Sequence, residues 1–429
     1  MSAARFKVQP DQVMKHAEYL ADTLGERLAG GEGEQRAADY IQSEMNRIGL
    51  QDVHQQSFTC KWYDVRHASM QARFGGQWRS VTMDAVAHTP STQGEIEAEL
   101  VYVGEATEDI LDHVDLHDKV ALVHGTYGPN AKMLRRFAQV GVAAAIWTDV
   151  RYTSDWNILV GLPWSFLPLL TFPAASVPFT VECELVEGRA DRVRLNLDTV
   201  VEDRQSQNVI GTLAGRSDAG GVLVSGHHDS VRLSVGAEDN AAGVAVTLAV
   251  AEALKGVPLE KPIRFVSFGT EEQLSQGSFA YVEEPRYRAE QLDLVLNTDG
   301  QGCWTGVSET YVTGSVEFHE YMRGQLAAHE FPGTMRHDPD AFSDHFPFMV
   351  RGVPAVWFYR RNCPGGRWFH HSIYDTINRL SPDLLSHCAS MVADIAADIA
   401  GQRDLPFERR FPEKTQQEVQ AVADGWLKI

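Results

Sequence analysis

The stretch VLVSGHHDS, residues 222–230, decides the fold, because a short aliphatic run ends there in a cluster of polar residues. Runs of Val, Ile and Leu without alternation are typical of strands buried on both faces of a parallel sheet. The pattern recurs along the chain, with amphipathic helical segments between the runs. The predicted strands are Val222–Ser225, Ile263–Phe268, Leu292–Asn297 and Val353–Phe358, and the predicted helices are 241–254, 277–284, 316–329 and 382–400. The sequence therefore predicts an α/β fold with a mostly parallel sheet.

Polar clusters follow the predicted strands, where ligands of such folds gather. The clusters are Gly226–Ser230, Gly236–Asn240, Gly269–Glu272, Asn297–Asp299 and His370–Thr376. Each is ordinary alone, but together they supply imidazole nitrogens and carboxylate oxygens, which are the ligands of zinc and related ions. A catalytic pair of ions needs a bridging carboxylate, terminal ligands and an open position for water. The residues that can fill these positions are His227, Asp239, Glu272, Asp299 and His371.

Two further roles follow from local spacing. Side chains alternate along an extended strand end, so His227 and Asp229 point the same way and His228 points away. Asp229 can therefore orient the imidazole of His227. In the adjacent pair Glu271-Glu272, one carboxylate can hold an ion while the other takes a proton from water, as a general base does.

Composition excludes several classes of protein. The chain has 429 residues with 38 Lys and Arg against 58 Asp and Glu, a net charge of −20, which disfavours binding to nucleic acid or to anionic membrane surfaces. Five scattered cysteines without a CxxC pair indicate reduced thiols rather than disulfides or a thiolate site. The N-terminus lacks an apolar signal region and no stretch is long enough to span a membrane, so we expect a cytoplasmic protein.

The pattern also predicts two domains. Residues 1–64, with helices at 10–24 and 33–48, join residues 199–429 in one α/β domain, and short β-like runs mark an inserted domain at 65–198. Within the insert, residues 158–172 are apolar but broken by Pro163 and Pro168, which predicts a wedge rather than a helix. This wedge, with Trp164 and Phe166, either covers the site as a lid or forms an exposed apolar patch at a subunit interface. Assembly into a homo-oligomer is left open.

The whole set of motifs resembles the M28 family of metallopeptidases. The matching stretches are Arg27–Gly31, His227-x-Asp229, Asp239-Asn240, Glu271-Glu272 with Gly277-Ser278, Asp299, Ser343–His345, and His371 with Asp375-Thr376. The resemblance implies a three-layer, phosphorylase/hydrolase-like sandwich with a mixed sheet, and a β-rich insert similar to a protease-associated (PA) domain. It also implies two divalent ions, zinc first and manganese or cobalt as alternatives.

By the same resemblance, Asp239 bridges the ions, His227 and Asp299 complete one site, Glu272 and His371 complete the other, and Glu271 is the general base. The sequence departs from many family members at Gln273–Gln276, which lies on the substrate-facing rim. The side chains that we expect near the substrate are Asp344, His345, Tyr359, Arg360 and Arg361. The two arginines could bind a substrate carboxylate, because a guanidinium fork matches its geometry.

Three functions remain open at this point. The first is a peptidase, most simply an aminopeptidase or dipeptidase acting on small peptides. The second is a hydrolase of small amines or amides, such as an amidohydrolase or an aromatic-amine deaminase of the nitroanthranilate aminohydrolase type. Arg360, Arg361 and the apolar wedge favour it. The third is a non-catalytic interaction protein, against which the complete ligand set argues.

Overall fold

The computed structural model describes residues 6–125, 130–149, 154–157, 161–331, 333–363 and 366–427. Contacts along the chain divide it into two compact units. Unit 1 comprises Met1–Cys60, Gln205–Cys363 and Ile373–Lys428, and unit 2 comprises Lys61–Arg204, Pro364–Ser372 and Ile429. The sequence placed the boundaries after residues 64 and 198, and it did not predict that a segment near residue 370 groups with unit 2.

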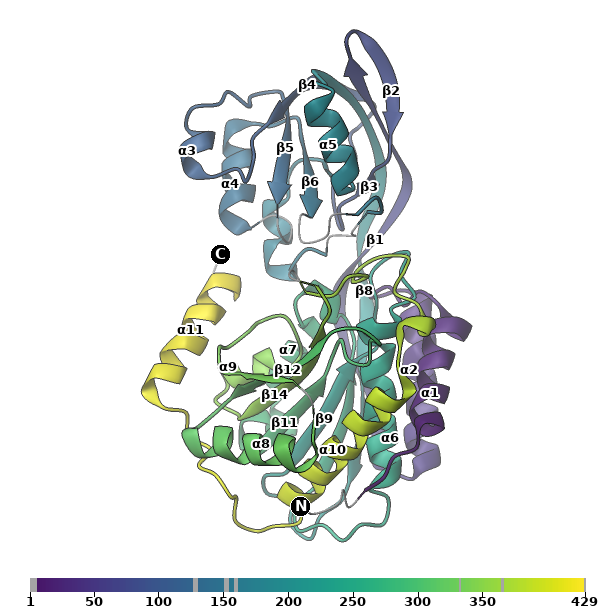
Figure 1. Cartoon of the computed structure of the whole chain (residues 1–429), viewed down its shortest axis with the longest axis vertical. Coiled ribbons are helices and arrows are strands. Elements are labelled where there is room, and N and C mark those ends of the chain that lie inside the picture. Colours follow the sequence, from purple (N-terminus) through teal and green to yellow (C-terminus); the bar gives the residue numbers. More distant parts are fainter. Residues whose placement is uncertain are drawn as a thin grey trace. The chain divides into compact units, whose positions relative to one another are not determined.

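Unit 1 is built on a mixed sheet, as predicted (Figure 1). Four neighbouring strands run parallel in the order β14-β11-β9-β10, and antiparallel strands flank them on both sides. The parallel strands are β9 (Val222–His227), β10 (Ile263–Phe268), β11 (Leu294–Thr298) and β14 (Ala355–Arg361). On one side lie β12 (Val307–Thr313) and β13 (Thr334–Arg336), and on the other lies β8 (Arg192–Leu213).

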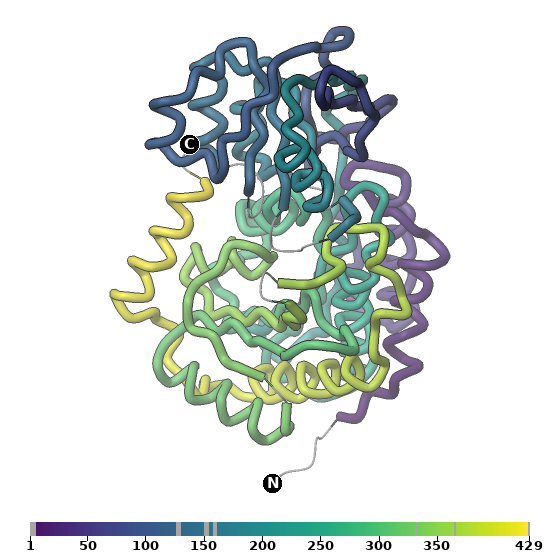
Figure 2. The backbone as a smooth tube through the Cα atoms, turned by 45° about the horizontal axis from the view of Figure 1, so that its top comes forward, coloured from purple at the N-terminus to yellow at the C-terminus, as the bar shows by residue number. Residues whose placement is uncertain are grey.

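Helices flank this sheet. The helix α6 (Ala242–Ala253) is apolar on all sides, and the residues from Ala242 to Ala251 are all buried. A helix of this kind must be covered all round, and α1 (Pro10–Glu18), α2 (Glu32–Ile48) and α10 (Pro382–Ala400) pack against it. Figures 1 and 2 show α1 and α10, from the two ends of the chain, side by side. A further group of helices contains α7 (Gln276–Glu283), α9 (Phe346–Val350) and α11 (Glu413–Leu427), and α8 (Val316–Ala328) lies beside β12.

Strand register places the polar clusters at one edge of the sheet. Phe268 of β10 pairs with His227 of β9, and Asn297 of β11 pairs with Ser225 of β9. Glu271 and Asp299 follow these strands directly. The carboxyl ends of β9, β10 and β11 therefore deliver their polar residues to the same place, as expected for a parallel α/β sheet.

Unit 2 contains its own α/β arrangement. The strands β4 (Ile96–Tyr102), β5 (Val120–Gly125), β6 (Ala144–Asp149) and β7 (Ala174–Ser176) run parallel, and β3 (Asp84–Ala85) pairs with β7. A hairpin of β1 (Gln51–Phe74) and β2 (Gln77–Val81) accompanies them. The helices are α3 (Glu108–Leu111), α4 (Ala131–Val140) and α5 (Phe179–Glu187). These helices make the insert less purely β-rich than expected.

The apolar wedge is not an exposed patch. Its described residues form a short 3₁₀ helix, Trp164–Leu169, and the side chains of Phe166 and Phe172 are buried. The ring of Phe172 packs against those of Phe137 and Trp147, at centroid distances of 6.0 and 6.4 Å. The burial of these two side chains does not favour an exposed apolar patch, and a role of the segment as a lid or as a subunit interface stays a prediction. Residues 158–160 of the predicted wedge lie outside the described residues.

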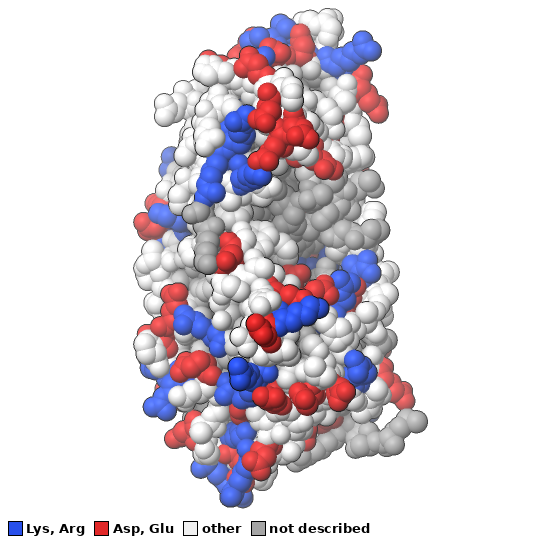
Figure 3. Space-filling model, turned by 90° about the vertical axis from the view of Figure 1, so that its left-hand side faces the viewer, with Lys and Arg blue, Asp and Glu red and all other residues white. Residues whose placement is uncertain are grey.

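The described surface is mixed in charge. Figure 3 shows acidic and basic side chains interspersed over one face of the molecule. On this face, the Lys and Arg side chains lie among the more numerous acidic residues of a chain with a net charge of −20. Within the described ranges, no helix combines the length and the apolar character that crossing a bilayer requires.

Candidate metal centre

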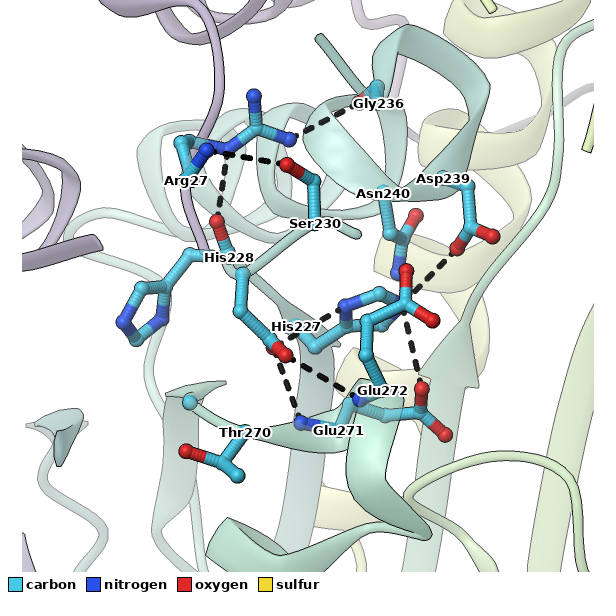
Figure 4. A network of polar contacts seen from close by, with 12 residues as sticks. Arg27, His227, His228, Ser230, Gly236, Asp239, Asn240, Thr270, Glu271 and Glu272 are labelled. Atoms are coloured by element: carbon cyan, nitrogen blue, oxygen red, sulfur yellow. Dashed lines mark hydrogen bonds and ion pairs between the residues drawn. The ribbon is translucent and has the colours of Figure 1, made fainter. Parts of the chain in front are cut away.

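Carboxylates and one imidazole meet at the carboxyl edge of the sheet in unit 1 (Figure 4). His227 ends β9, Asp299 follows β11, and Glu271 opens a single 3₁₀ turn after β10. Asp239 comes from the loop that leads into α6. All four side chains are buried, with at most 9% of the residue exposed. A group of buried carboxylates needs a positive partner, because burying unpaired charge is costly.

Three carboxylate oxygens converge on one nitrogen of His227. Its Nε2 lies 3.2 Å from Asp239 Oδ1, 3.6 Å from Asp299 Oδ1 and 3.8 Å from Glu271 Oε2. Within the described chain, neither ring nitrogen makes a hydrogen bond of regular geometry, although both are buried. His227, Asp239 and Asp299 each offer one ligand atom, and these atoms lie within 4.8 Å of one another. Imidazole and carboxylates around one point fit a divalent ion of the zinc type.

The electrostatics of these side chains fit a bound cation. Burial alone lowers the pKa of His227, but Glu271, Asp229, Asp239 and Asp299 together raise it well above its usual range. In the converse direction, burial raises the pKa of Glu271 well above its usual range, and the neighbouring carboxylates add to the effect while His227 opposes it. Protons held by His227 and Glu271 thus offset the negative charge of the buried carboxylates. A bound divalent ion can offset this charge instead.

Asp229 links the imidazole to the two glutamates. Its Oδ1 lies 3.4 Å from His227 Nδ1, so it can fix the ring orientation as predicted from the strand spacing. It also accepts main-chain hydrogen bonds from Glu271 N (3.0 Å) and Glu272 N (3.1 Å). No local pattern marks this second role of Asp229, because it depends on the pairing of β9 with β10. His228 points away, as Figure 4 shows, and its Nδ1 contacts Ser267 Oγ at 3.0 Å.

Asp375 supports the loop that carries Asp239. Its two carboxylate oxygens accept hydrogen bonds from Glu238 N (2.8 Å) and Asp239 N (3.0 Å). The loop begins at Gly236 in a left-handed conformation (φ 52°), where a Cβ atom would clash with the main-chain oxygen of Asp239. A glycine is therefore required at this turn.

Glu271 is held from two sides. Its Oε1 accepts a hydrogen bond from Ser275 Oγ (3.2 Å), and its main-chain oxygen accepts one from Ser275 N (2.7 Å). Ser275 belongs to the segment that departs from the common family pattern. It adopts a left-handed conformation (φ 53°), as does its neighbour Leu274 (φ 68°). Such conformations cost energy for residues with a side chain, and they are frequent at functional sites.

A chain of buried polar side chains supports Asp299. Ser225 Oγ donates to Asn297 Oδ1 (2.8 Å), Asn297 Nδ2 donates to Ser343 Oγ (2.6 Å), and Ser343 Oγ donates to Asp299 Oδ2 (2.6 Å). In the sequence, Ser343 stands out only as part of the Ser343–His345 motif. Its contact with Asp299 shows why a small hydroxyl stands there: it fixes one carboxylate oxygen and leaves Oδ1 facing His227.

The comparisons with known proteins concern the region that holds the site. Residues 208–396, which include His227, Asp239, Glu271 and Asp299, match the model of peptidase family M28. The chain is similar to this family over that region. It is 26% identical to aminopeptidase YwaD of Bacillus subtilis (strain 168) over 397 residues, which is 88% of this chain and 83% of the relative. It is 23% identical to carboxypeptidase Q of Xenopus laevis, over 90% of this chain and 85% of that protein.

Solved structures show the same fold. BSAP, a zinc aminopeptidase from Bacillus subtilis, superposes with a TM-score of 0.76 at 23% identity, covering 96% of this chain and 100% of that one. An M28 peptidase precursor from Shewanella amazonensis SB2B gives a TM-score of 0.80 at 19% identity, covering 94% and 95%. The chain is a metal-dependent hydrolase, and its fold is shared along nearly its whole length.

The two remaining predicted ligands, Glu272 and His371, lie in different parts of the chain. Glu272 is half-buried beside Glu271, and its amide is held by Asp229. His371 is buried in the segment Pro364–Ser372, which groups with unit 2, and its ring stacks on that of His370. The pairing of Glu272 with His371 in a second ion site therefore stays a prediction.

The predicted substrate-binding residues are mostly buried. Asp344 accepts a hydrogen bond from Ser278 Oγ (2.6 Å), burial raises its pKa to about 8, and the ring of His345 stacks on Trp357. Tyr359 is also largely buried.

The two arginines are engaged within the chain. The Nε of Arg360 donates to the carbonyl oxygens of Cys303 (2.7 Å) and Thr305 (3.3 Å), and its Nη1 donates to Ser308 Oγ (3.1 Å). Arg361 pairs with Glu309 at 3.1 Å. Direct binding of substrate by any of these five residues stays a prediction.

We expect Asp229→Asn to lower the affinity for Zn²⁺ by ~10–100-fold, as loss of a ligand's supporting partner typically does. An amide has one acceptor oxygen, so it cannot satisfy both Glu271 N and Glu272 N while orienting His227. Asp293→Asn is the matched control, because Asp293 is also buried and accepts a main-chain hydrogen bond, from Gly221 N (2.9 Å), at the opposite ends of the strands. Calorimetric titration checks both. An affinity unchanged in Asp229→Asn would contradict the role.

Proposed function

We propose that this chain is an aminopeptidase that removes N-terminal residues from small peptides with the help of two divalent ions, zinc first. The observation that carries the proposal is the convergence of Asp239, Asp299 and Glu271 oxygens on His227 Nε2. Aminopeptidase YwaD and BSAP, the latter described as a zinc enzyme, support the substrate class and the metal.

The residues divide into ligands and a base. His227 and Asp299 would hold one ion, Glu272 and His371 the other, and Asp239 would bridge them. Bound ions of this type lower the pKa of water and polarise a carbonyl. Asp229, Asp375 and Ser343 would keep the ligands in place through the contacts described above.

Glu271 would act as the general base that accepts a proton from water. Its carboxylate lies at the ligand cluster, with Oε2 at 3.8 Å from His227 Nε2, and its Oε1 accepts a hydrogen bond from Ser275 Oγ. Burial raises its pKa above the usual range of a carboxyl, which suits a group that accepts a proton from water near neutral pH. The same group can then deliver that proton to the leaving amine of the product.

The alternative of a small-molecule amine or amide hydrolase has less support. It rested on Arg360 and Arg361 as a carboxylate fork and on the apolar wedge. Arg360 donates to main-chain oxygens, Arg361 is paired with Glu309, and the wedge side chains Phe166 and Phe172 are buried. The relatives named above are both described as peptidases that act at chain ends.

A panel of substrates tests the proposal. Zn²⁺-loaded protein is assayed with aminoacyl p-nitroanilides, dipeptides, their N-acetylated forms, N-acyl amino acids and aminobenzoates. We expect hydrolysis of the substrates with a free α-amine and little of their acetylated forms. A Glu271→Gln preparation, purified in parallel, controls for contaminating peptidases. Turnover confined to aminobenzoates or N-acyl amino acids would contradict the proposal.

A further inference from the structure

We propose that Arg27 is a positioning residue that holds the loop Val235–Asp239 against the carboxyl end of β9, and so places Asp239 for the ions. The inference rests on the proposed function, because Asp239 matters in this way only if the chain binds divalent ions there. Arg27 itself touches none of the proposed ligands' side chains.

The guanidinium of Arg27 is completely buried and joins three parts of unit 1 (Figure 4). Its hydrogen bonds all end on main-chain oxygens: Nε on His228 (2.7 Å), Nη1 on Val235 (2.6 Å), Gly25 (2.9 Å) and Leu20 (3.2 Å), and Nη2 on Gly236 (2.9 Å). The main chain is tied as well, because Arg27 N donates to Ser230 Oγ (3.0 Å) and Ser230 N donates to Arg27 O (3.1 Å).

A salt bridge does not account for this buried cation. Among the described residues, no carboxylate lies within ion-pair distance of Arg27, and every acceptor of its guanidinium is a carbonyl. Burial lowers its pKa to about 10, opposed by Asp375, Asp229, Asp239 and Glu272, so it stays charged at neutral pH. A cation in this place offsets part of the negative charge of the ligand cluster and can donate several hydrogen bonds in one plane.

These contacts act directly on the Asp239 loop. Val235 and Gly236 lie just before Asp239, and a Cβ atom at Gly236 would stand 3.0 Å from Arg27 Nη2, so loop and guanidinium are closely packed. Asp375 holds the same loop from the other side through Glu238 N and Asp239 N. Without Arg27 the loop would lose its hydrogen bonds at Val235 and Gly236, and Asp239 could shift relative to His227.

Arg27→Lys tests the proposal, because lysine keeps the charge but cannot reach five carbonyl oxygens from one plane. Arg264→Lys is the control. Arg264 is half-buried at the amino end of β10, and it also donates to a main-chain oxygen, that of Tyr287. The Zn²⁺ affinity of the wild type and of both variants is measured by calorimetry. Their kcat and KM are measured at saturating Zn²⁺, and their Tm is measured after removal of Zn²⁺.

We expect Arg27→Lys to lower Zn²⁺ affinity by ~10–100-fold, with a KM near wild type once Zn²⁺ is saturating. Arg264→Lys should lower Tm without changing Zn²⁺ affinity. If Arg27→Lys does not fold, Ser230→Ala replaces it, since Ser230 Oγ joins Arg27 N to Ser234 O (3.0 Å) and its loss loosens the same loop more mildly.

Two results would overturn the role of Arg27: Zn²⁺ affinity equal to wild type in the folded variant, or an equal loss of affinity in Arg264→Lys, which would reflect general softening. A wild-type protein that binds no Zn²⁺ would instead refute the proposed function. The two failures are therefore distinguishable.

Discussion

Glu271→Gln is expected to lower kcat by ~10²-fold or more while leaving folding and Zn²⁺ affinity near wild type. Glutamine keeps the size of the side chain and can still accept the hydrogen bond from Ser275 Oγ, but it cannot take up a proton. The loss should be in kcat rather than KM, because the proton moves during the reaction and not on binding. Steady-state kinetics at saturating Zn²⁺ provide the measurement.

Two further variants sharpen this result. Glu272→Gln should lower the Zn²⁺ content, because Glu272 is proposed as a ligand and not as a base. Glu283→Gln, at the exposed end of α7, should change neither quantity. If Glu271→Gln turned over at a rate close to wild type, Glu271 could not be the general base, whatever the metal content.

Asp239→Asn is expected to have the second large effect, a loss of Zn²⁺ affinity beyond the ~10–100-fold that removal of a supporting partner costs. A carboxylate can bridge two ions with two charged oxygens, whereas an amide offers one neutral oxygen. Activity should fall with the ion content and should not recover fully at saturating Zn²⁺. Calorimetry and kinetics on the same preparation separate the two losses.

The control for Asp239→Asn is again Asp293→Asn, a buried aspartate at the amino ends of the strands that pairs with Lys261 at 3.0 Å. It should affect Tm alone. An Asp239→Asn protein that bound two Zn²⁺ ions with wild-type affinity would remove Asp239 from the proposed centre.

The α/β fold of unit 1 could be predicted because its signals are local. The aliphatic run at Val222–Ser225 is short and uninterrupted, and α6 is apolar all round, so strand and helix are each specified within a few residues. The parallel sheet then fixes where strand ends meet. The same logic predicted Asp229 beside His227, at 3.4 Å in the structure.

Features that depend on distant partners could not be predicted. The helix α5 contains Phe179, Thr180 and Val181, which favour strands, and its packing in unit 2 overrides that preference. Phe166 and Phe172 are apolar in sequence, and an apolar residue can be buried or exposed. Only the structure shows that both are buried. The contact of Ser343 with Asp299 and the three contacts of Arg27 with the carbonyl oxygens of His228, Val235 and Gly236 join segments far apart in sequence, so no local pattern marks them.

The most direct test of the account is to count ions while measuring peptide hydrolysis. Protein stripped with a chelator is titrated with Zn²⁺, and bound zinc per chain is determined alongside hydrolysis of an aminoacyl p-nitroanilide. The account predicts no turnover in the stripped protein, two bound ions per chain at saturation, and turnover that rises as the sites fill. Full turnover in protein proven free of divalent ions, or saturation at one ion per chain with full activity, would contradict it.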